Sequence, residues 1–228
     1  MTAERYLCNL GAFSETELHA VHSGSVGIIG CGGLGGYVCN ALARFGIGSL
    51  TLIDGDVFTE RNLNRQLFSL PKSIGKSKTL ITRELIGEIN AHIQVTAHPV
   101  MLSQANAGEL LSGCDLAVDC LDNIPARRIL AGVCNEIKIP LIHGAISGLF
   151  GQVACVYPGD RLFDYLYDPT FEGKAVMLGS PVFTPQIVAS IQACEAVKII
   201  CGRDSALRNC VLYIDLNHYS FETVRFGK

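Results

Sequence analysis

Long apolar segments and targeting signals are missing from this chain. No stretch of its 228 residues approaches the roughly 20 uninterrupted apolar residues that cross a bilayer. The most apolar helical segment, Val182 to Cys201, is interrupted by glutamine and charged residues, so we interpret it as a core helix. The start, MTAERYLCNL, lacks a basic region followed by an apolar stretch and a cleavage site. We therefore expect a cytoplasmic protein without a membrane partner.

An excess of positive charge is also missing. The formal net charge is −3, and no basic stretch is interleaved with aromatic residues. Such a chain has no long-range attraction for nucleic acid. A nucleic-acid partner is therefore not expected, and any phosphate site must be local.

The chain has no Cys-x-x-Cys pair, although it contains ten cysteines. Zinc knuckles and redox motifs use such pairs, so we expect no zinc site. Reduced cysteine packs well in apolar surroundings, and we expect most of these thiols to be buried. Six of them fall in expected strands, helices or apolar flanks: Cys31, Cys39, Cys114, Cys120, Cys155 and Cys194.

Strands and helices alternate along the first two thirds of the chain. The expected strands are Ser25–Gly30, Ser49–Asp54, Ile93–His98, Asp115–Asp119 and Leu141–Ala145. The expected helices are Leu34–Phe45, Lys76–Asn90, Gln104–Leu111 and Ala126–Lys138. This alternation predicts an α/β fold, a Rossmann-like, mostly parallel sheet with helices on both faces. With 49% hydrophobic and 17% charged residues, residues 1–228 suit a single well-buried domain.

The last third of the chain has a different pattern. The segment Gly151 to Tyr157 follows its predecessor after a short turn, and Val211–Asp215 with Ser220–Arg225 resembles a hairpin. We therefore expect antiparallel strands toward the C-terminus. The proline-containing stretch 157–185 has weak periodicity, and we interpret it as a long surface loop, with disorder as the alternative.

A glycine-rich turn follows the first expected strand and opens a helix. Gly30, Gly32, Gly33 and Gly35 match the G-x-G-x-x-G pattern, which lets the backbone approach a phosphate at a helix N-terminus. Asp54 ends the next strand, at the distance along the chain where an acidic residue binds a ribose. The alternative for this residue is an exposed aspartate in an Asp-Gly turn.

Amides and cations follow this acidic residue. Asn62, Arg65 and Gln66 lie in the stretch NLNRQ, and Lys78 lies in GKSK. A nucleotide transfer from ATP needs charge compensation on the phosphates and on the departing pyrophosphate, and a plain NAD-binding oxidoreductase does not. Arg65 and Lys78 fit that need, although a solvated helix face is the alternative for each one alone.

Further carboxylates lie where a magnesium ion would be expected. Asp122 follows the fourth expected strand, at the same edge of the sheet. Magnesium commonly binds one or two protein carboxylates together with nucleotide phosphates, so Asp122 is the candidate ligand, with Asp56 as a second. The alternative for Asp122 is an N-cap of the helix beginning near Pro125.

The motifs GCGGLGG, DGD, NLNRQ, GKSK and DCLDN, in this order, resemble the adenylation domain of the ThiF/MoeB/HesA and ubiquitin-activating superfamily. The resemblance covers nearly the whole chain, so residues 1–228 are interpreted as one adenylation domain. It implies that Asp54 binds the ribose hydroxyls, that Asn62, Arg65 and Gln66 contact the phosphates, that Lys78 neutralises the α-phosphate region, and that Asp122 binds magnesium.

The resemblance also implies an activity and partners. The enzyme would use ATP and Mg²⁺ to adenylate the C-terminal Gly-Gly carboxylate of a small ubiquitin-like sulfur-carrier protein, releasing pyrophosphate. It would act as a homodimer. The competing interpretations are an enzyme like the tRNA threonylcarbamoyladenosine dehydratase and a non-catalytic partner that binds a carrier.

The chain departs from the family pattern at several positions. It lacks the zinc-binding cysteine pairs of some members, and no cysteine lies between Cys155 and Cys194, so we expect the reaction to stop at the adenylate. Cys8 occupies the place of a family arginine near the N-terminus, for which Arg5 is a candidate substitute. His143 has no evident dyad partner in the sequence, which favours a structural or tail-contacting role.

Overall fold

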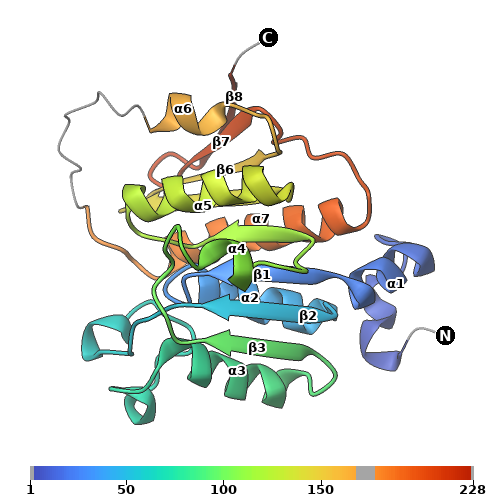
Figure 1. Ribbon diagram of the computed structural model, residues 1–228, viewed down its shortest axis with the longest axis vertical. Coiled ribbons are helices and arrows are strands. Elements are labelled where there is room, and N and C mark those ends of the chain that lie inside the picture. The colour runs from blue at the N-terminus through green and yellow to red at the C-terminus, as the bar shows by residue number, and fades with distance from the viewer. Residues whose placement is uncertain (1–2, 168–177, 227–228) are drawn as a thin grey trace.

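The computed structural model describes residues 3–167 and 178–226, which contain one eight-stranded sheet of order β3-β2-β1-β4-β5-β6-β7-β8 (Figure 1). The strands are β1 (Ser25–Ile29), β2 (Ser49–Ile53), β3 (Gln94–His98), β4 (Leu116–Asp119), β5 (Leu141–Ser147), β6 (Phe150–Val156), β7 (Cys210–Asp215) and β8 (Ser220–Arg225). Strands β1 to β5 pair in parallel, and β6 to β8 are antiparallel. The expected Rossmann-like α/β class is confirmed.

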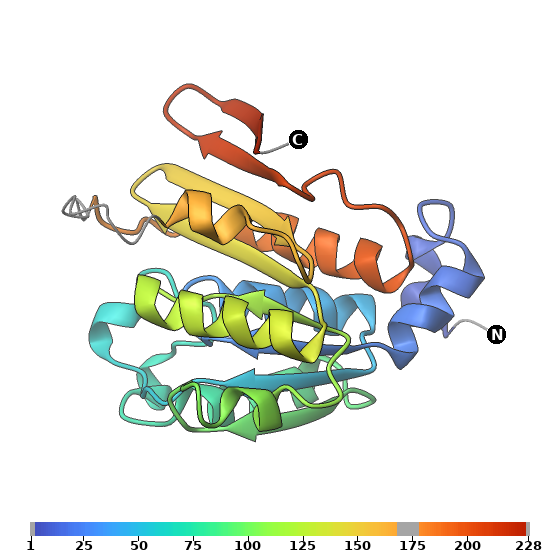
Figure 2. The same ribbon diagram turned by 45° about the horizontal axis from the view of Figure 1, so that its top comes forward.

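Helices lie on both faces of this sheet (Figures 1 and 2). The α-helices are α1 (Glu15–Ser23), α2 (Gly35–Phe45), α3 (Lys78–Ile89), α4 (Ala107–Leu110), α5 (Ile124–Ile137), α6 (Leu162–Leu166) and α7 (Phe183–Ile200). Short 3-10 helices are η1 (Glu4–Asn9), η2 (Glu60–Asn62) and η3 (Pro71–Ser73). Helix α2 packs against α3 and α7 on one face, and α4 packs against α5 on the other. None of the described helices is long and apolar enough to cross a membrane.

Two apolar clusters hold these layers together. Because successive strand residues point to opposite faces, Ile28 lies in the cluster under α2 and α7, and its neighbour Ile29 lies in the cluster under α4 and α5. Both side chains are fully buried. The near-continuous apolar sequence of β1 follows from this burial on both faces.

Helices α6 and α1 were not expected from the sequence, whereas α7 was. Residues 157–185 contain α6, and α7 begins within them at Phe183, so the interpretation of one long loop is wrong for those parts; residues 168–177 lie outside the described residues. Helix α1 begins with a capping box, in which the Ser14 side chain accepts from the Glu17 backbone N–H and the Glu17 carboxylate accepts from the Ser14 N–H. The Ser-x-x-Glu spacing was the available signal for this helix.

The position expected for Cys194 is also wrong. The other five cysteines of the expected buried set are buried, but Cys194 is exposed on α7. Apolar residues occur all around this helix, so their spacing does not identify its exposed side. The buried positions include Ala193, Ala196 and Val197 on either side of this thiol.

Candidate functional site

The glycine turn between β1 and α2 leaves no room for side chains at two positions. A Cβ atom on Gly30 would lie 2.6 Å from the Cys120 carbonyl oxygen, and Gly30 has a φ of 95°, which favours glycine. A Cβ atom on Gly35 would overlap the Gly30 carbonyl oxygen. The turn therefore brings the N-terminus of α2 and the chain after β4 close together at the carboxyl edge of the parallel strands.

Asp54 fixes this turn to the end of β2. One of its carboxylate oxygens accepts from the Cys31 N–H at 2.7 Å, and the other accepts from the Asp56 N–H at 2.8 Å. Burial raises the pKa of Asp54, while the positive charge of Lys78 lowers it. The residue expected to bind a ribose thus also holds the glycine turn.

Lys78 is buried at the start of α3, beside the same turn. Its Nζ lies 2.8 Å from Asp56 Oδ2 and 4.0 Å from Asp54 Oδ2. The Lys78 N–H also donates to the Asp56 carbonyl at 3.0 Å. A buried ammonium between two carboxylates is a fixed positive charge at this edge of the sheet.

Arg65 and Gln66 approach the turn from the chain between β2 and α3. A Cβ atom on Gly33 would lie 3.9 Å from Arg65 Nε, and one on Gly32 would lie 3.4 Å from Gln66 Nε2. Gln66 Oε1 is buried and has no hydrogen-bond partner within residues 3–167 and 178–226. A buried amide oxygen without a donor indicates a position where a ligand or water is needed.

Asn62 belongs to the same segment, but its hydrogen bonds are to neighbouring residues of that segment. Its Oδ1 accepts from the Thr59 N–H at 2.9 Å, which closes the short helix η2. The Asn62 carbonyl accepts from the Arg65 and Gln66 N–H groups at 3.1 and 2.9 Å. Asn62 therefore orients the two residues that face the glycines.

Asp122 is exposed in the turn that follows β4. The chain reaches this turn beside Gly30, because Cys120 donates its N–H to the Ile29 carbonyl at 2.9 Å. The Asp122 carboxylate accepts one long hydrogen bond, 3.4 Å from Asn123 Nδ2. The N-cap of α5 is Asn123, whose Oδ1 accepts from the Ala126 N–H at 2.9 Å, so the N-cap interpretation of Asp122 is wrong.

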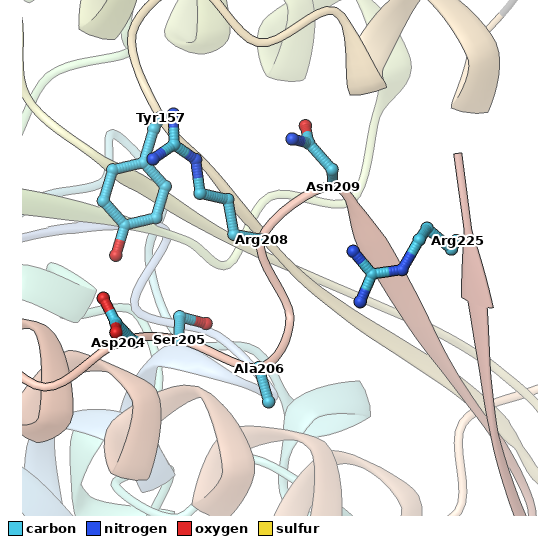
Figure 3. Close-up of a pocket in the computed structure, with 7 residues that line it drawn as sticks. All are labelled: Tyr157, Asp204, Ser205, Ala206, Arg208, Asn209 and Arg225. Atoms are coloured by element: carbon cyan, nitrogen blue, oxygen red, sulfur yellow. The ribbon is translucent and has the colours of Figure 1, made fainter. Parts of the chain in front are cut away.

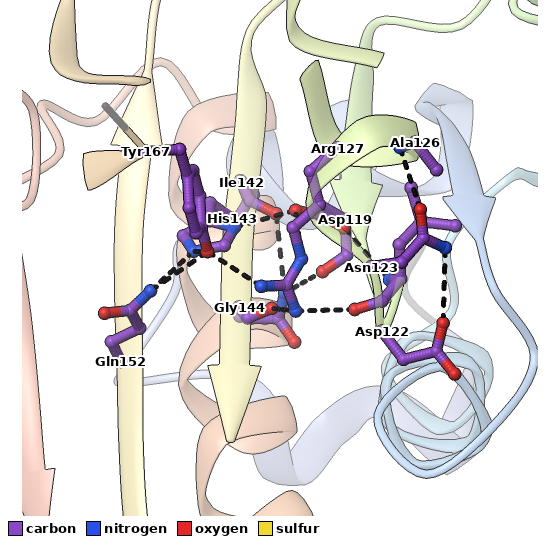
Figure 4. A network of polar contacts seen from close by, with 12 residues as sticks. Asp119, Asp122, Asn123, Ala126, Arg127, Ile142, His143, Gly144, Gln152 and Tyr167 are labelled. Atoms are coloured by element: carbon purple, nitrogen blue, oxygen red, sulfur yellow. Dashed lines mark hydrogen bonds and ion pairs between the residues drawn. The ribbon is translucent and has the colours of Figure 1, made fainter. Parts of the chain in front are cut away.

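A buried polar network lies directly behind this turn (Figure 4). Asp119 and His143 are both fully buried, and Asp119 Oδ2 lies 2.7 Å from His143 Nδ1. The sequence analysis found no dyad partner for His143, but the parallel register of β4 and β5 places these two residues opposite each other. Burial lowers the pKa of His143, so its ring is neutral at pH 7 and donates to Asp119.

Arg127 and Tyr167 complete this network, and sequence reasoning missed both. Arg127 Nη1 donates to the Tyr167 hydroxyl at 2.7 Å, and the Tyr167 hydroxyl lies 3.0 Å from His143 Nε2. The one signal in the sequence was Asp119 itself, a carboxylate at the end of the apolar run Leu116–Val118. A buried carboxylate needs partners, but a sequence does not name them.

Arg5 does not reach this site within its own chain. Its guanidinium donates to Asn90 Oδ1 at 2.7 Å, next to the C-terminal end of α3. Lys78 lies at the other end of that helix, about 18 Å away along an axis of 1.5 Å per residue. Arg5 therefore does not substitute for the family arginine in the site of the same chain.

A cavity of about 340 Å³ lies away from the glycine turn (Figure 3). It is lined by Tyr157, Asp204, Ser205, Ala206, Arg208, Asn209 and Arg225. Tyr157 follows the end of β6, which pairs with the beginning of β5, so the cavity is at the amino edge of the parallel strands. Ligands of such sheets bind at the opposite edge.

The residues at the glycine turn fit a magnesium ion that is bound mainly through the nucleotide. Among the described parts of the chain, no group of three or more His, Cys, Asp or Glu side chains is arranged to hold a metal ion. Magnesium needs only one or two protein carboxylates when phosphate oxygens and water supply its other ligands. The exposed carboxylate of Asp122 beside the glycine turn is suited to be one of these protein ligands.

A parallel sheet with a glycine turn at its carboxyl edge, flanked by Lys78, Arg65 and acidic side chains, defines an α/β nucleotide-binding domain. Residues 5–228 match the ThiF family. The match spans nearly the whole chain, and the chain belongs to this family.

The relatives found by sequence are adenylyltransferases and activating enzymes by name. The chain is 31% identical over 208 residues to the SAMP-activating enzyme E1 of Haloferax volcanii, covering 90% of this chain and 77% of that protein. It is 33% identical over 197 residues to the molybdopterin-synthase adenylyltransferase of Escherichia coli, covering 85% and 79%. It is 30% identical to the adenylyltransferase and sulfurtransferase MOCS3 of Drosophila virilis, and spans 49% of that protein.

Solved structures share the fold. Escherichia coli MccB superposes with a TM-score of 0.86 at 20% identity, covering 99% of this chain and 70% of that chain. A structure of MccB with ATP superposes with a TM-score of 0.83 at the same identity, covering all of this chain and 73% of that one. At this identity the likeness describes the architecture and not the substrate.

Proposed function

We propose that this protein uses ATP to adenylate the C-terminal Gly-Gly carboxylate of a small ubiquitin-like sulfur-carrier protein. The observation that carries the proposal is the convergence of Arg65, Gln66 and Lys78 on the glycine turn. A triphosphate bound there has cations beside it that a plain dinucleotide site does not need. The relatives whose names refer to SAMP and to molybdopterin synthase support the choice of carrier.

In the proposed reaction a carboxylate oxygen of the carrier attacks the α-phosphorus of ATP. A new P–O bond forms to the carboxylate, the bond between the α-phosphorus and its bridging oxygen breaks, and pyrophosphate leaves with that electron pair. A carboxylate is already a nucleophile at neutral pH, so no general base is required. The protein therefore acts by holding two anions together and compensating their charge.

Each residue of the site has a proposed role in that task. The backbone N–H groups after Cys31 bind phosphate oxygens at the N-terminus of α2. Asp54 binds the ribose hydroxyls, Lys78 compensates charge near the α-phosphate, and Arg65, with Asn62 and Gln66, contacts the remaining phosphates. Lys78 is supported in this role by its burial and by its distance of 4.0 Å from Asp54.

Asp122 is the proposed protein ligand of Mg²⁺, with Asp56 as a second candidate. When bound, the metal supplies positive charge to the phosphate oxygens. Its support is the exposed position of Asp122 beside the turn, where its carboxylate accepts one long hydrogen bond from a neighbouring side chain. Asp56 is engaged with Lys78, so a metal there would compete with that ion pair.

The proposed reaction ends at the adenylate, and the protein acts as a homodimer. No cysteine occurs between Cys155 and Cys194 to receive the activated carboxyl group. A dimer is proposed by resemblance to the family.

The test is ATP–pyrophosphate exchange by the purified protein. A Gly-Gly carrier should stimulate the exchange, the same carrier without its last two glycines should not, and transfer RNA should not. Stimulation by transfer RNA alone would support the dehydratase-like activity instead. Carrier binding without exchange would support a non-catalytic partner.

A further inference from the structure

The peptide that precedes Asp122 is held from both sides by side chains. The Leu121 N–H donates to Asp119 Oδ1 at 2.9 Å, and the Leu121 carbonyl accepts from Arg127 Nη2 at 2.6 Å. Asp122 follows directly, and its own carboxylate has only one long contact within the described residues. The direction in which this carboxylate leaves the chain is therefore set by the Leu121 peptide.

Arg127 is the centre of this arrangement (Figure 4). It is only 8% exposed, and its Nε lies 3.6 Å from Asp119 Oδ2. A second donor, Nη1, binds the Tyr167 hydroxyl at 2.7 Å, and Nη2 also reaches the Gly144 carbonyl at 3.4 Å. The planar guanidinium thus joins the chain after β4 to the middle of β5 and to the residue after α6.

Burying a guanidinium costs free energy unless its donors are satisfied. Here the Nη donors are used on backbone carbonyls and on a tyrosine. Nε makes no hydrogen bond within the described residues and only an ion pair with the partner carboxylate, 3.6 Å away. Asp119 itself is fixed by His143 and by Gln192, whose Nε2 donates to the Asp119 carbonyl at 2.9 Å. A network rooted in β4, β5 and α7 therefore ends at one exposed carboxylate.

We propose that Arg127 is a positioning residue for the metal-binding carboxylate of Asp122, and that the Tyr167 hydroxyl locks Arg127 in place. This inference rests on the proposed function, because it assigns a purpose to Asp122. Arg127 touches neither metal nor nucleotide in this account. It acts by keeping the Leu121 peptide in one orientation, as partners behind a metal ligand do.

The network also connects the site to the chain between β6 and α7. Tyr167 follows α6, and its hydroxyl contacts Arg127, His143 and, at 3.2 Å, Gln152 Nε2. Replacing Tyr167 by phenylalanine removes the hydroxyl and leaves Arg127 Nη1 without this acceptor. The aromatic ring remains, so no cavity forms. Tyr167→Phe therefore tests the lock with a minimal change in packing.

The first measurement needs no ligand. Hydrogen exchange at the Leu121 amide, which donates to Asp119 Oδ1, is compared in wild type, Arg127→Met, Tyr167→Phe and two controls. Arg128→Gln removes a charge from the next position of α5, where the side chain makes no hydrogen bond or ion pair within the described residues. Tyr165→Phe changes an exposed residue of α6. Exchange should accelerate in the Arg127 and Tyr167 variants alone.

The second measurement is the affinity for Mn²⁺, observed by electron paramagnetic resonance with a non-hydrolysable ATP analogue. Arg127→Met should weaken Mn²⁺ binding about 10- to 100-fold, the usual effect of removing a partner behind a metal ligand. Tyr167→Phe should weaken it severalfold, and metal-free binding of the analogue should stay unchanged. If Arg127→Met does not fold, Tyr167→Phe carries the same test.

Equal Mn²⁺ affinity in wild type, Arg127→Met and Tyr167→Phe would overturn the inference and leave the proposed function standing. Loss of Mn²⁺ binding in Asp122→Asn with no effect of either network variant would do the same. Absence of Mn²⁺–nucleotide binding in the wild type would instead contradict the proposed function, and the inference with it.

Discussion

Lys78 and Asp56 form an ion pair whose two members differ in exposure: Nζ lies 2.8 Å from Oδ2, and the side chains are 9% and 55% exposed. The cation is fixed in the protein, whereas its partner faces solvent. Phosphate oxygens can therefore approach Lys78 from the side that Asp56 now occupies. The positive charge of Lys78 is therefore partly shielded by an exposed carboxylate.

Asp56→Asn should separate two roles of this carboxylate. If it mainly shields Lys78, the variant should bind ATP more tightly without metal, by about 3- to 10-fold, since a partly exposed charge pair contributes about 1 kcal/mol. If it binds the metal, the variant should need more Mg²⁺ for the same activity. Titration calorimetry with and without Mg²⁺ distinguishes the two, and unchanged binding in both titrations would exclude a role in the site.

Lys78→Met should lower carrier-stimulated ATP–pyrophosphate exchange by about 10²- to 10³-fold, the usual effect of removing one charge-stabilising group from a site. Lys76→Met is the matched control, because Lys76 is exposed in the same segment. The control should keep its activity. Similar losses of exchange activity in both variants would mean that Lys78 does not stabilise the reaction through its position beside the glycine turn.

The N-terminal segment should be held by a pH-dependent contact. Arg203 Nη2 donates to Glu17 Oε2 at 2.9 Å, and hydrogen bonds from Arg203 and then from Ser14 lower the pKa of Glu17 from 4.5 to about 2. Because the folded-state pKa is depressed, the stabilisation is present above the ordinary pKa and is lost as pH falls toward about 2.

Glu17→Gln should therefore lower the free energy of unfolding near neutral pH, and the difference from wild type should vanish in acid. Denaturant unfolding between pH 7 and pH 2 measures it. Arg203→Gln should show the same pH-dependent loss on top of a constant one, because Arg203 Nη2 also donates to the Ala12 carbonyl at 2.9 Å. The pH-dependent parts of the two losses should not add in the double variant. A difference that persists unchanged at pH 2 would contradict this origin of the effect.

Thiol reactivity should follow exposure along the chain. Cys8 and Cys194 are exposed, whereas burial raises the pKa of Cys31 and Cys120 well above the ordinary value. Only the thiolate reacts readily, so the buried thiols should be protected. Brief alkylation of the native protein followed by peptide mass spectrometry should find Cys8 and Cys194 modified first. Early modification of Cys31 would contradict the packing of the glycine turn.

Much of the fold could be predicted because its signals are local. Each strand and helix that was expected in the parallel half lies within a few residues of its expected range, since apolar runs and glycine turns mark them directly. Helix α7 was placed well, but its exposed side was not, because apolar residues surround it. Cys194 was misplaced for that reason.

The site could be predicted only in part. Gly30 and Lys78 belong to short motifs, so the sequence indicated them, and the topology brings them to one edge of the sheet. The partners of Asp119 could not be predicted. His143 and Tyr167 lie 24 and 48 positions further along the chain, and only the register of β4 and β5 and the position of α6 bring them to Asp119 and Arg127.

The most direct test of the account is to trap the activated carrier. The protein is incubated with ATP, Mg²⁺, a Gly-Gly carrier and hydroxylamine, which converts an acyl-adenylate into a stable hydroxamate, and the carrier is weighed by mass spectrometry. Wild type should give the hydroxamate in proportion to pyrophosphate released, and Lys78→Met and Asp122→Asn should give almost none. Hydroxamate formation by both variants at the wild-type rate would contradict the account.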